Sequence, residues 1–459
     1  MCMEKTIFIT VAETSVLRNL LRTDFWDELI GAGVRIVLVT TPAVEPVVRE
    51  FAQGKVIVAV LPALPVFLKE KIIAFLARNG FMSSTQVIMQ RRTKAAGESR
   101  VPLWLKHLLM RSIGSVPMLR ALVRRADLSI EASGDVAALF ARYAPSLVFG
   151  TVLTDAALDV PLLREAKRRK IQTVGMVRGW DNLTTYGLLR ILPDIFFAQN
   201  DFLAEKVVSL HGMPKDKVVI VGTPFFDLYR RADLLVPREV YCTQVGIDPS
   251  DRIVLYGAIG DYLFPHEGEL ADVFESLVTS GALSQNTQVI FRAHPAFSSP
   301  LEYMHGLAHV QPDRNATYTD SVLQHWDMTT ANTVHLINSI YHADVVVTAG
   351  STLMIEAALL DKSIVSVAFD GRSKVPYWFS IARFHDRAVH IVDLLKTGGV
   401  RVAHSEHELA EWIRGYLDTP GLDAEGRVRL VARFAGPNIG EAGRRMGELV
   451  VHLASQGLR

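Results

Sequence analysis

The sequence predicts an α/β protein made of two Rossmann-like, doubly wound domains and a C-terminal helical tail. Three observations predict this class. Apolar, β-branched runs alternate with helical patterns from Thr6 to Val221, as is typical of βαβ units around a parallel sheet. The stretch Gly222–Asp227 interrupts the alternation, and a second alternating series extends from Arg252 to Val367. Two doubly wound halves in succession imply a cleft between them, where ligands bind.

The first half alternates regularly except for one helical insertion. The expected strands are Thr6–Val11, Arg35–Thr40, Lys55–Val60, Leu147–Val152, Gln172–Val177, Ile195–Ala198 and Lys217–Val221, and the expected helices include Arg18–Ile30, Val44–Ala52, Asp159–Lys170 and Leu203–His211. The insertion covers residues 81–125. We therefore expect residues 1–222 to form the first of the two domains.

The second half repeats the pattern with its own strands and helices. The expected strands are Arg252–Tyr256, Gln288–Arg292, Val345–Thr348 and Ser363–Val367, and the expected helices are Glu267–Ser280, Val334–Tyr341 and Thr352–Leu360. We expect residues 223–430 to form a donor-binding domain. Residues 431–459 read as a helix that packs on the outside or crosses back to the first domain.

Composition excludes several classes of protein. A formal charge of +1 over 459 residues argues against nucleic-acid binding, and 49% hydrophobic residues argue against disorder. The two cysteines, Cys2 and Cys242, provide neither a disulfide framework nor a cysteine-rich metal site. We find no signal peptide and no window that could span a bilayer, because Pro62 and Pro65 interrupt the most apolar one. We therefore expect a cytoplasmic protein.

The strongest candidate site follows the expected strand Val345–Thr348. Gly350 would let a ligand approach the backbone, and the amides and hydroxyls at Ser351 and Thr352 suit a phosphate at a helix start. Glu356 lies one helical turn further and would accept hydrogen bonds from ribose hydroxyls. The alternative is an ordinary helix cap at Ser351 or Thr352, with Glu356 as a late capping partner or as a solvated side chain.

Two further segments of the second half follow strands. Arg292 offers donors for phosphate oxygens, and His294 can protonate a departing phosphate; alternation places both on one side of the strand. Gly257 and Gly260 suit a loop pressed against a ligand. A surface arginine with a turn-forming His-Pro, and a plain strand-to-helix turn, are the structural alternatives.

The first half offers a candidate acceptor site. Arg178, Trp180 and Asn182 would bind a sugar by stacking and hydrogen bonding, and Asp181 could be the general base for an acceptor hydroxyl. Glu13, after the first strand, is a reserve base. A turn in which Asp181 and Asn182 cap the next helix explains the same residues.

The helical insertion contains a basic, amphipathic stretch from Val101 to Arg125. Trp104 and neighbouring leucines share a helix face, while positive charge comes from Lys106, Arg111, Arg120, Arg124 and Arg125. Such a helix could contact an anionic membrane on the cytoplasmic side. An ordinary packed helix with a solvated basic face is the alternative.

Several motifs are absent from the whole sequence. It contains no Asp-x-Asp, no P-loop and no His-Glu-x-x-His. Gly31-Ala32-Gly33 follows a helix and is not a dinucleotide fingerprint. We therefore expect no cofactor and no obligatory metal, and the nucleotide-activated donor would be a substrate.

These motifs together resemble the GT-B superfamily. The similarity is to the branch that contains CDP-glycerol glycerophosphotransferases, surface-polysaccharide glycosyltransferases and non-hydrolysing UDP-N-acetylglucosamine 2-epimerases. The matching parts are Val221–Asp227, Arg292–Pro295, Ala343–Thr348 with Gly350–Thr352 and Glu356, and Trp180–Thr184, and the resemblance extends from Thr6 to Leu395.

The resemblance implies roles for the second-half residues. Gly350, Ser351 and Thr352 would hold the donor diphosphate, Glu356 the ribose, and Arg292 and His294 the phosphates or leaving group. The glycerophosphotransferases usually carry an Asp-Tyr-Ser-Ser-like run where this chain has Ala349–Thr352. This departure favours a sugar donor over a polyol-phosphate donor.

The resemblance implies a metal-independent GT-B glycosyltransferase. It would move a sugar from a nucleotide-diphosphate or CMP-type donor to a hydroxyl of a glycan or lipid-linked glycan, in bacterial capsule or cell-envelope polysaccharide synthesis. A glycerophosphotransferase, a UDP-sugar 2-epimerase and a non-catalytic nucleotide-sugar binding protein are the alternatives. The nucleotide, the sugar and the anomeric outcome stay open.

Overall fold

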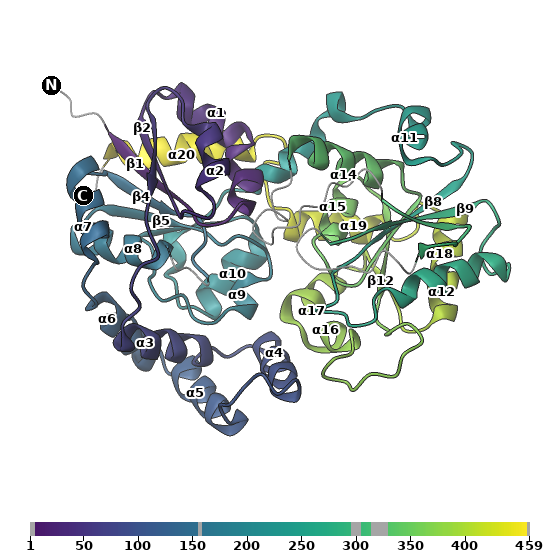
Figure 1. Ribbon diagram of the computed structural model, residues 1–459, viewed down its shortest axis with the longest axis horizontal. Coiled ribbons are helices and arrows are strands. Elements are labelled where there is room, and N and C mark those ends of the chain that lie inside the picture. Colours follow the sequence, from purple (N-terminus) through teal and green to yellow (C-terminus); the bar gives the residue numbers. More distant parts are fainter. Residues whose placement is uncertain (1–4, 155–157, 295–303, 314–328, 457–459) are drawn as a thin grey trace. The chain divides into compact units, whose positions relative to one another are not determined.

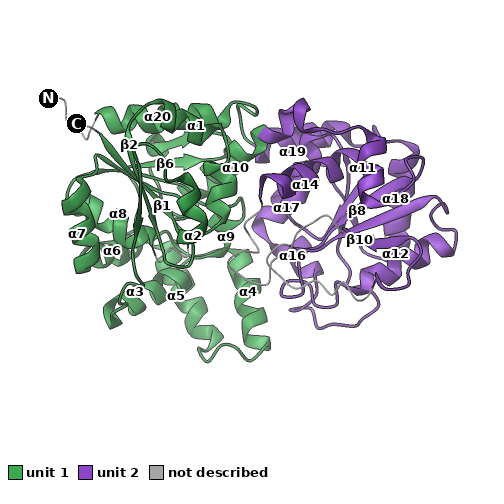
Figure 2. Ribbon diagram, turned by 45° about the horizontal axis from the view of Figure 1, so that its top comes forward, with its two compact units in different colours: residues 1–227, 436–459 green, residues 228–435 purple. Residues whose placement is uncertain are grey.

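The computed structural model describes residues 5–154, 158–294, 304–313 and 329–456. The chain forms two compact units (Figure 2), unit 1 with residues 1–227 and 436–459 and unit 2 with residues 228–435. We had expected the divisions after residues 222 and 430. Each unit contains one sheet, and every strand pairing in both sheets is parallel.

Unit 1 has a seven-stranded sheet with the order β3-β2-β1-β4-β5-β6-β7. Its strands are β1 (Thr6–Val11), β2 (Arg35–Thr40), β3 (Val56–Val60), β4 (Leu147–Gly150), β5 (Gln172–Gly175), β6 (Ile195–Ala198) and β7 (Val218–Ile220). The central strands are buried on both faces, which explains their continuous apolar runs. The order of the strands reverses between β1 and β4.

Helices connect these strands, as parallel pairing requires. They are η1 (Leu17–Leu21), α1 (Asp24–Gly31), α2 (Glu45–Val48), η2 (Arg49–Phe51), α7 (Gly134–Tyr143), α8 (Asp159–Arg168), α9 (Asn182–Thr185), α10 (Asp201–Ser209), η3 (Lys215–Lys217) and η4 (Pro224–Arg230). One expected helix, Arg18–Ile30, is divided at Thr23, whose hydroxyl accepts a hydrogen bond from the Phe25 amide at 3.4 Å and caps α1.

The helical insertion is longer than the expected residues 81–125. It comprises α3 (Leu68–Asn79), α4 (Ser84–Ala95), α5 (Leu103–Ser115) and α6 (Pro117–Leu128) (Figure 1). Ile73, Phe81, Ile113 and Val123 form a separate small core within it. No helix in the described part of the chain is long and apolar enough to cross a membrane.

The insertion turns inward much of the positive charge that we had expected on its surface. Arg124 donates to the carbonyls of Leu189 and His211 at 2.9 and 2.7 Å, and Arg120 donates to Leu210 at 3.0 Å. Lys106 is buried and donates to Ser99 at 2.8 Å. Only Arg111 and Arg125, of the five basic residues expected there, are exposed.

Unit 2 has a six-stranded sheet with the order β10-β9-β8-β11-β12-β13. Its strands are β8 (Arg252–Gly257), β9 (Thr287–Arg292), β10 (Val310–Pro312), β11 (Val345–Thr348), β12 (Ser363–Val367) and β13 (Arg401–Ala403). Its helices are η5 (Ala232–Leu234), α11 (Arg238–Val245), α12 (Glu269–Thr279), α14 (Thr330–His342), α15 (Leu353–Leu359), α16 (Ala382–Arg387), α17 (Val389–Leu395), α18 (Glu406–Asp418) and α19 (Ala424–Phe434). The order reverses between β8 and β11.

The C-terminal helix α20 (Ala442–Gln456) belongs to unit 1 and packs against α1 (Figure 1). Met446 and Val450 join the core beneath the sheet. Asp227 fixes the start of this segment, because its two carboxylate oxygens accept from the amides of Gly440 at 2.6 Å and Gly443 at 2.8 Å. The segment Gly222–Asp227, which the sequence indicated as a boundary, therefore anchors the end of the chain to unit 1.

Candidate functional site

The point where the strand order of unit 2 reverses brings together three of the sequence motifs. Ligands of open α/β sheets bind outside the carboxyl ends of the strands at such a point. The last residue of β8, Gly257, is paired in register with Arg292 on β9 and with Thr348 on β11. The glycine loop, the arginine and the turn after β11 therefore start side by side along one edge of the sheet.

In the turn after β11, two backbone amides are free, whereas the Ser351 hydroxyl already accepts hydrogen bonds within the protein. Gly350 has a φ of 101°, a left-handed conformation that favours glycine. The Ser351 hydroxyl accepts from the amide of Leu353 at 3.1 Å and from the Thr348 hydroxyl at 3.2 Å, so it acts as a helix cap. The amides of Gly350 and Ser351 donate to no acceptor in the described part of the chain, and they can bind an anion.

The helix after this turn is shorter than expected. α15 has seven residues, so its dipole would add little to the binding of an anion, and the turn amides would be the main donors. Thr352 precedes the helix, and its carbonyl accepts from the amide of Glu356 at 3.1 Å. Glu356 is buried, with 5% of its surface exposed, which excludes the solvated glutamate of the structural alternative.

Arg292 is held by a carboxylate that the motif analysis missed. Its Nη1 lies 2.5 Å from Oδ2 of Asp313, and the other oxygen of Asp313 lies 2.6 Å from Nε2 of His335. Burial alone would raise the pKa of Asp313, but the hydrogen bond from His335 and the charge of Arg292 outweigh it and lower the pKa. Asp313 is therefore an ionised anchor that fixes the guanidinium at the sheet edge.

His294 lies beyond the end of its strand, whereas the sequence predicted that it shares a strand face with Arg292. β9 ends at Arg292, so His294 lies beyond the strand, where side chains no longer alternate regularly. It is partly buried. The neighbouring Pro295 lies outside the described residues. The structure thus puts His294 two residues past the candidate phosphate site but does not fix it on the face of Arg292.

The glycine loop after β8 differs from the expected phosphate cradle. The buried carboxylate of Glu267 accepts from the amides of Ile259 at 2.8 Å and Gly260 at 2.7 Å and from the Tyr256 hydroxyl at 2.7 Å. The Gly260 amide is thus occupied. At Gly257, a Cβ would lie 2.2 Å from a methyl carbon of Leu353, so any larger residue there would displace the Leu353 side chain at the start of α15.

The corresponding point of unit 1 carries charged side chains in place of glycine turns. Glu13 follows β1, Arg178 follows β5, and their side chains form an ion pair across the end of β4. Burial alone would lower the pKa of Arg178, but the Glu13 carboxylate raises it above its ordinary value. Arg178 also donates to the Tyr186 hydroxyl at 3.2 Å. Because the Glu13 carboxylate is already engaged by Arg178 and by the Ser15 hydroxyl, Glu13 is disfavoured as the general base.

The residues after Arg178 form a turn in which Trp180 and Asn182, both predicted to contact a sugar, are instead buried within the protein. Asn182 is buried and accepts from the Gly179 amide at 2.9 Å, and its amide group donates to Asp181 at 3.0 Å. Trp180 is 7% exposed and presents no open ring face for stacking on a sugar. Asp181 is partly exposed and precedes α9, so it is the accessible carboxylate of this group.

Unit 1 also contains a buried acid, Asp159, close to the ends of β1 and β4. Asp159 is fully buried and accepts from the Thr10 hydroxyl at 2.7 Å and the Val152 amide at 3.0 Å. Its other oxygen has no hydrogen-bond partner among the described residues. Burial raises the pKa of Asp159 to about 7. In the sequence an aspartate at the start of a helix reads as an ordinary cap, so nothing marked it.

No three His, Cys, Asp or Glu side chains of the described residues lie close enough together to hold a metal ion. Metal independence stays a prediction, because this observation does not test the reaction.

The fold is shared with solved structures of nucleotide-sugar enzymes, although the sequences differ widely. A UDP-N-acetylglucosamine 2-epimerase is 13% identical to this chain, with a TM-score of 0.53. The match covers 100% of this chain and 98% of that one. The Neisseria meningitidis UDP-GlcNAc 2-epimerase bound to UDP-GlcNAc is 10% identical, with a TM-score of 0.53, 99% and 100% covered. The Staphylococcus aureus MnaA structure with UDP is 11% identical, with a TM-score of 0.53, 99% and 99% covered.

Comparison with family models and with curated proteins gave no match. The likeness to the solved structures spans both units and nearly the whole of each chain. The chain therefore has the GT-B-type fold, in the two-unit form that UDP-N-acetylglucosamine 2-epimerases also have.

Proposed function

We propose that unit 2 binds the diphosphate and ribose of a nucleotide sugar at the carboxyl ends of β8, β9 and β11. The observation that carries this proposal is the register that aligns Arg292, Gly257 and Thr348 at the point where the strand order reverses. Arg292 supplies charge, the amides of Gly350 and Ser351 supply donors, and Glu356 contacts the ribose. The UDP-GlcNAc bound to the Neisseria meningitidis structure is consistent with a ligand of this class.

The reaction we propose is transfer of the sugar to an acceptor hydroxyl. Asp181 acts as the general base, since Glu13 is engaged by Arg178. Arg292 and the turn amides stabilise the negative charge that develops on the leaving diphosphate, and His294 assists from the same connection. Asn182 supports Asp181 through their hydrogen bond and does not contact the acceptor itself.

Epimerisation of the sugar at C2 is the second candidate, because solved structures with this fold carry that name. Incubation of the protein with UDP-GlcNAc, followed by proton NMR, distinguishes the two reactions. A transferase releases UDP only when an acceptor is present. An epimerase gives a new UDP-sugar without acceptor and without free UDP. If neither product forms with any of several nucleotide sugars, yet one of them binds, the protein is a nucleotide-sugar binding protein.

We also propose that unit 1 contacts an anionic membrane through one face of its helical insertion. Helices α3, α5 and α6 pack on one another and expose large apolar side chains. These are Phe67, Leu68, Ile72, Trp104, Leu108, Met118 and Leu122, with Trp104 68% exposed. Lys69, Lys71, Arg111 and Arg125 are exposed on the same helices and complement anionic lipid. Apolar insertion therefore contributes more to this contact than the sequence indicated.

Co-sedimentation with liposomes tests this contact. We expect wild type to sediment with phosphatidylglycerol liposomes and Trp104→Ser with Leu68→Ser to reduce binding at least ~10-fold, since each burial contributes ~1.5–3 kcal/mol. Val428→Ser is the matched control, because Val428 in unit 2 is also 68% exposed. Equal binding by all three proteins would show that the acceptor is met without this surface.

A further inference from the structure

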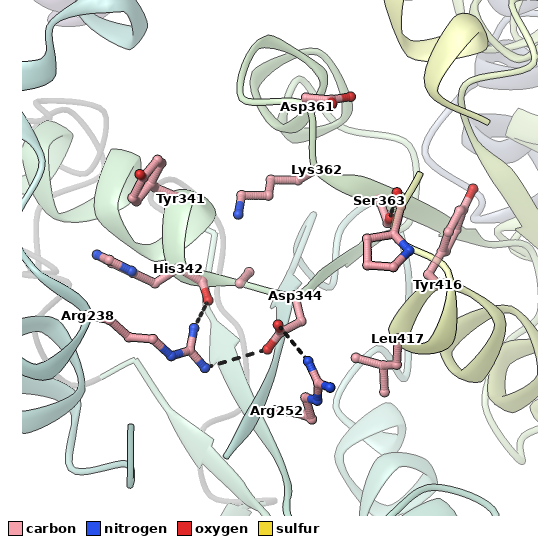
Figure 3. A pocket seen from close by; sticks show the side chains of 12 residues that line it. Arg238, Arg252, Tyr341, His342, Asp344, Asp361, Lys362, Ser363, Tyr416 and Leu417 are labelled. Atoms are coloured by element: carbon pink, nitrogen blue, oxygen red, sulfur yellow. Dashed lines mark hydrogen bonds and ion pairs between the residues drawn. The ribbon is translucent and has the colours of Figure 1, made fainter. Parts of the chain in front are cut away.

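A cavity of about 180 Å³ opens at the opposite end of the unit 2 sheet from the proposed nucleotide site (Figure 3). It lies at the amino ends of β8, β11 and β12, where Arg252, Asp344 and Lys362 begin or precede the strands. A strand rises about 3.3 Å per residue, so the six residues of β8 place the cavity roughly 16 Å from the carboxyl edge. It is thus separate from the nucleotide site.

Positive charge exceeds negative charge around this cavity. Its lining contains three basic side chains, Arg238, Arg252 and Lys362. One carboxylate, Asp344, lies between the two arginines, 3.6 Å from a guanidinium nitrogen of each. The other lining carboxylate, Asp361, is paired with Arg427 at 2.7 Å and is 72% exposed. Two carboxylates, one of them already paired with Arg427, therefore face three positive charges.

Arg238 is fixed in position by backbone carbonyls. It donates to Pro249 at 2.9 Å, to His342 at 2.8 Å and to Asp251 at 2.7 Å. These bonds hold the guanidinium near Asp344; the bond to His342 and the ion pair with Asp344 are the dashed lines at Arg238 in Figure 3. Arg238 therefore supplies a rigid positive charge, whereas the half-exposed Arg252 can turn toward a ligand.

Among the side chains that line the cavity, Lys362 is the one best suited to bind an anion. Its ammonium nitrogen lies 5.3 Å from the centre of the Tyr341 ring and forms no hydrogen bond or ion pair with any residue in the described ranges (Figure 3). The side chain is only partly exposed. Burial lowers the pKa of Lys362, and Arg238 lowers it further, while the charges of Asp344 and Asp361 offset these effects only in part. A bound anion would offset both effects.

We propose that this cavity binds a phosphate group, contacted by Lys362 and Arg252 and oriented by Arg238. A tetrahedral dianion suits the set, because it can accept from an ammonium and a guanidinium at once. The volume admits a phosphate or a phosphate monoester, and the phosphate belongs either to a small metabolite or to a lipid headgroup. The site does not depend on the proposed nucleotide function.

Phosphorus NMR and calorimetry of the full-length protein with inorganic phosphate, at constant ionic strength, test the proposal. We expect saturable binding that Lys362→Gln and Arg252→Gln each weaken about 10-fold or more, as loss of ~1.4 kcal/mol implies. Lys396→Gln is the matched control, since Lys396 is 69% exposed in the same unit. Binding should survive Arg292→Ala, which affects only the nucleotide site.

Two outcomes overturn the proposal. One is the absence of phosphate binding, and the other is binding that Arg292→Ala abolishes and Lys362→Gln leaves intact. To identify the source of the phosphate, the same variants are tested with glycerol 3-phosphate and with liposomes containing phosphatidic acid, whose headgroup is a phosphate monoester. A metabolite site responds to Lys362→Gln only with the soluble ligand. A headgroup site responds with the liposomes as well.

Discussion

The two sheets reverse their strand order in the same way, yet the edge at each reversal point carries different chemistry. In unit 2 the edge has a left-handed glycine turn with free amides and an arginine, Arg292. In unit 1 the edge has the ion pair of Glu13 and Arg178 and no glycine at the matching turn after β4. The same scaffold therefore presents free backbone amides and an arginine at one edge and an ion pair at the other, which is why we propose that the phosphate binds to unit 2.

Each edge also contains a buried acid, and the two acids are used differently. Asp159 in unit 1 accepts through one oxygen, and Glu267 in unit 2 accepts through both. Burial raises the pKa of each to about 7. The Glu267 carboxyl group thus occupies the amides of the loop after β8, which leaves the turn after β11 as the proposed phosphate site of unit 2.

The largest expected effect is on the pH dependence of stability, through Asp159. Its folded-state pKa of about 7 lies above the unfolded value of 3.8, so the protein loses stability as pH rises from about 4 to about 7. Each unit of pKa difference corresponds to about 1.4 kcal/mol. Asp159→Asn keeps the acceptor for Thr10 and should remove this share of the slope. Urea unfolding between pH 4 and pH 8 measures it, and an unchanged slope in the variant would contradict the assignment.

Glu267→Gln should destabilise the protein, because it breaks hydrogen bonds that the wild-type carboxyl group accepts. The carboxylate accepts from three donors, and an amide nitrogen in place of one oxygen would face a donor instead of accepting from it. We expect destabilisation of about 1–3 kcal/mol at pH 4. The difference should shrink toward pH 8, because the raised pKa of Glu267 makes the wild type lose stability as pH rises. Urea unfolding in the same series measures it. If Glu267→Gln is as stable as wild type, the loop after β8 is free to bind a ligand and our assignment of its amides is wrong.

The strands of both sheets were predictable from the sequence, and the buried acids were not. Apolar runs such as Arg35–Thr40 and Val345–Thr348 coincide with β2 and β11, because buried parallel strands are apolar throughout. The edge strands β10 and β13 were missed, since each has only three residues. Asp313 was missed for a different reason: its role depends on partners 21 and 22 residues away, Arg292 and His335.

The candidate site was predictable where a motif lies next to a strand end. Gly350 and Arg292 reach the edge of the sheet because the strands before them do. Trp180 and Gly260 differ from the prediction, because burial and the carboxylate of Glu267 are set by packing that no local pattern contains.

Loss of the guanidinium in unit 2 should weaken nucleotide binding, and loss of the one in unit 1 should not. Arg292→Ala removes a charged donor worth about 1.5–3 kcal/mol, which raises the dissociation constant for UDP roughly 10-fold to 100-fold. Arg178→Ala is the matched control and should leave that constant unchanged while lowering turnover. Calorimetry with both variants decides. Equal losses of affinity in the two variants would contradict our inference that the nucleotide is bound by the unit 2 edge and not by the unit 1 edge.

The smallest expected effect concerns Glu356, where charge and hydrogen bonding can be separated. Its carboxylate is buried beside the turn after β11 and is proposed to accept from ribose hydroxyls. Glu356→Gln keeps one acceptor oxygen, so we expect about 1 kcal/mol of lost affinity for UDP and a larger loss for Glu356→Ala. Uridine diphosphate and an analogue lacking both ribose hydroxyls are then compared in wild type and in Glu356→Gln. If the ribose contact is real, the analogue binds both proteins equally, because there is no hydroxyl left to lose. If Glu356→Gln instead weakens UDP and the analogue by the same factor, the glutamate supports the turn and the ribose is recognised elsewhere.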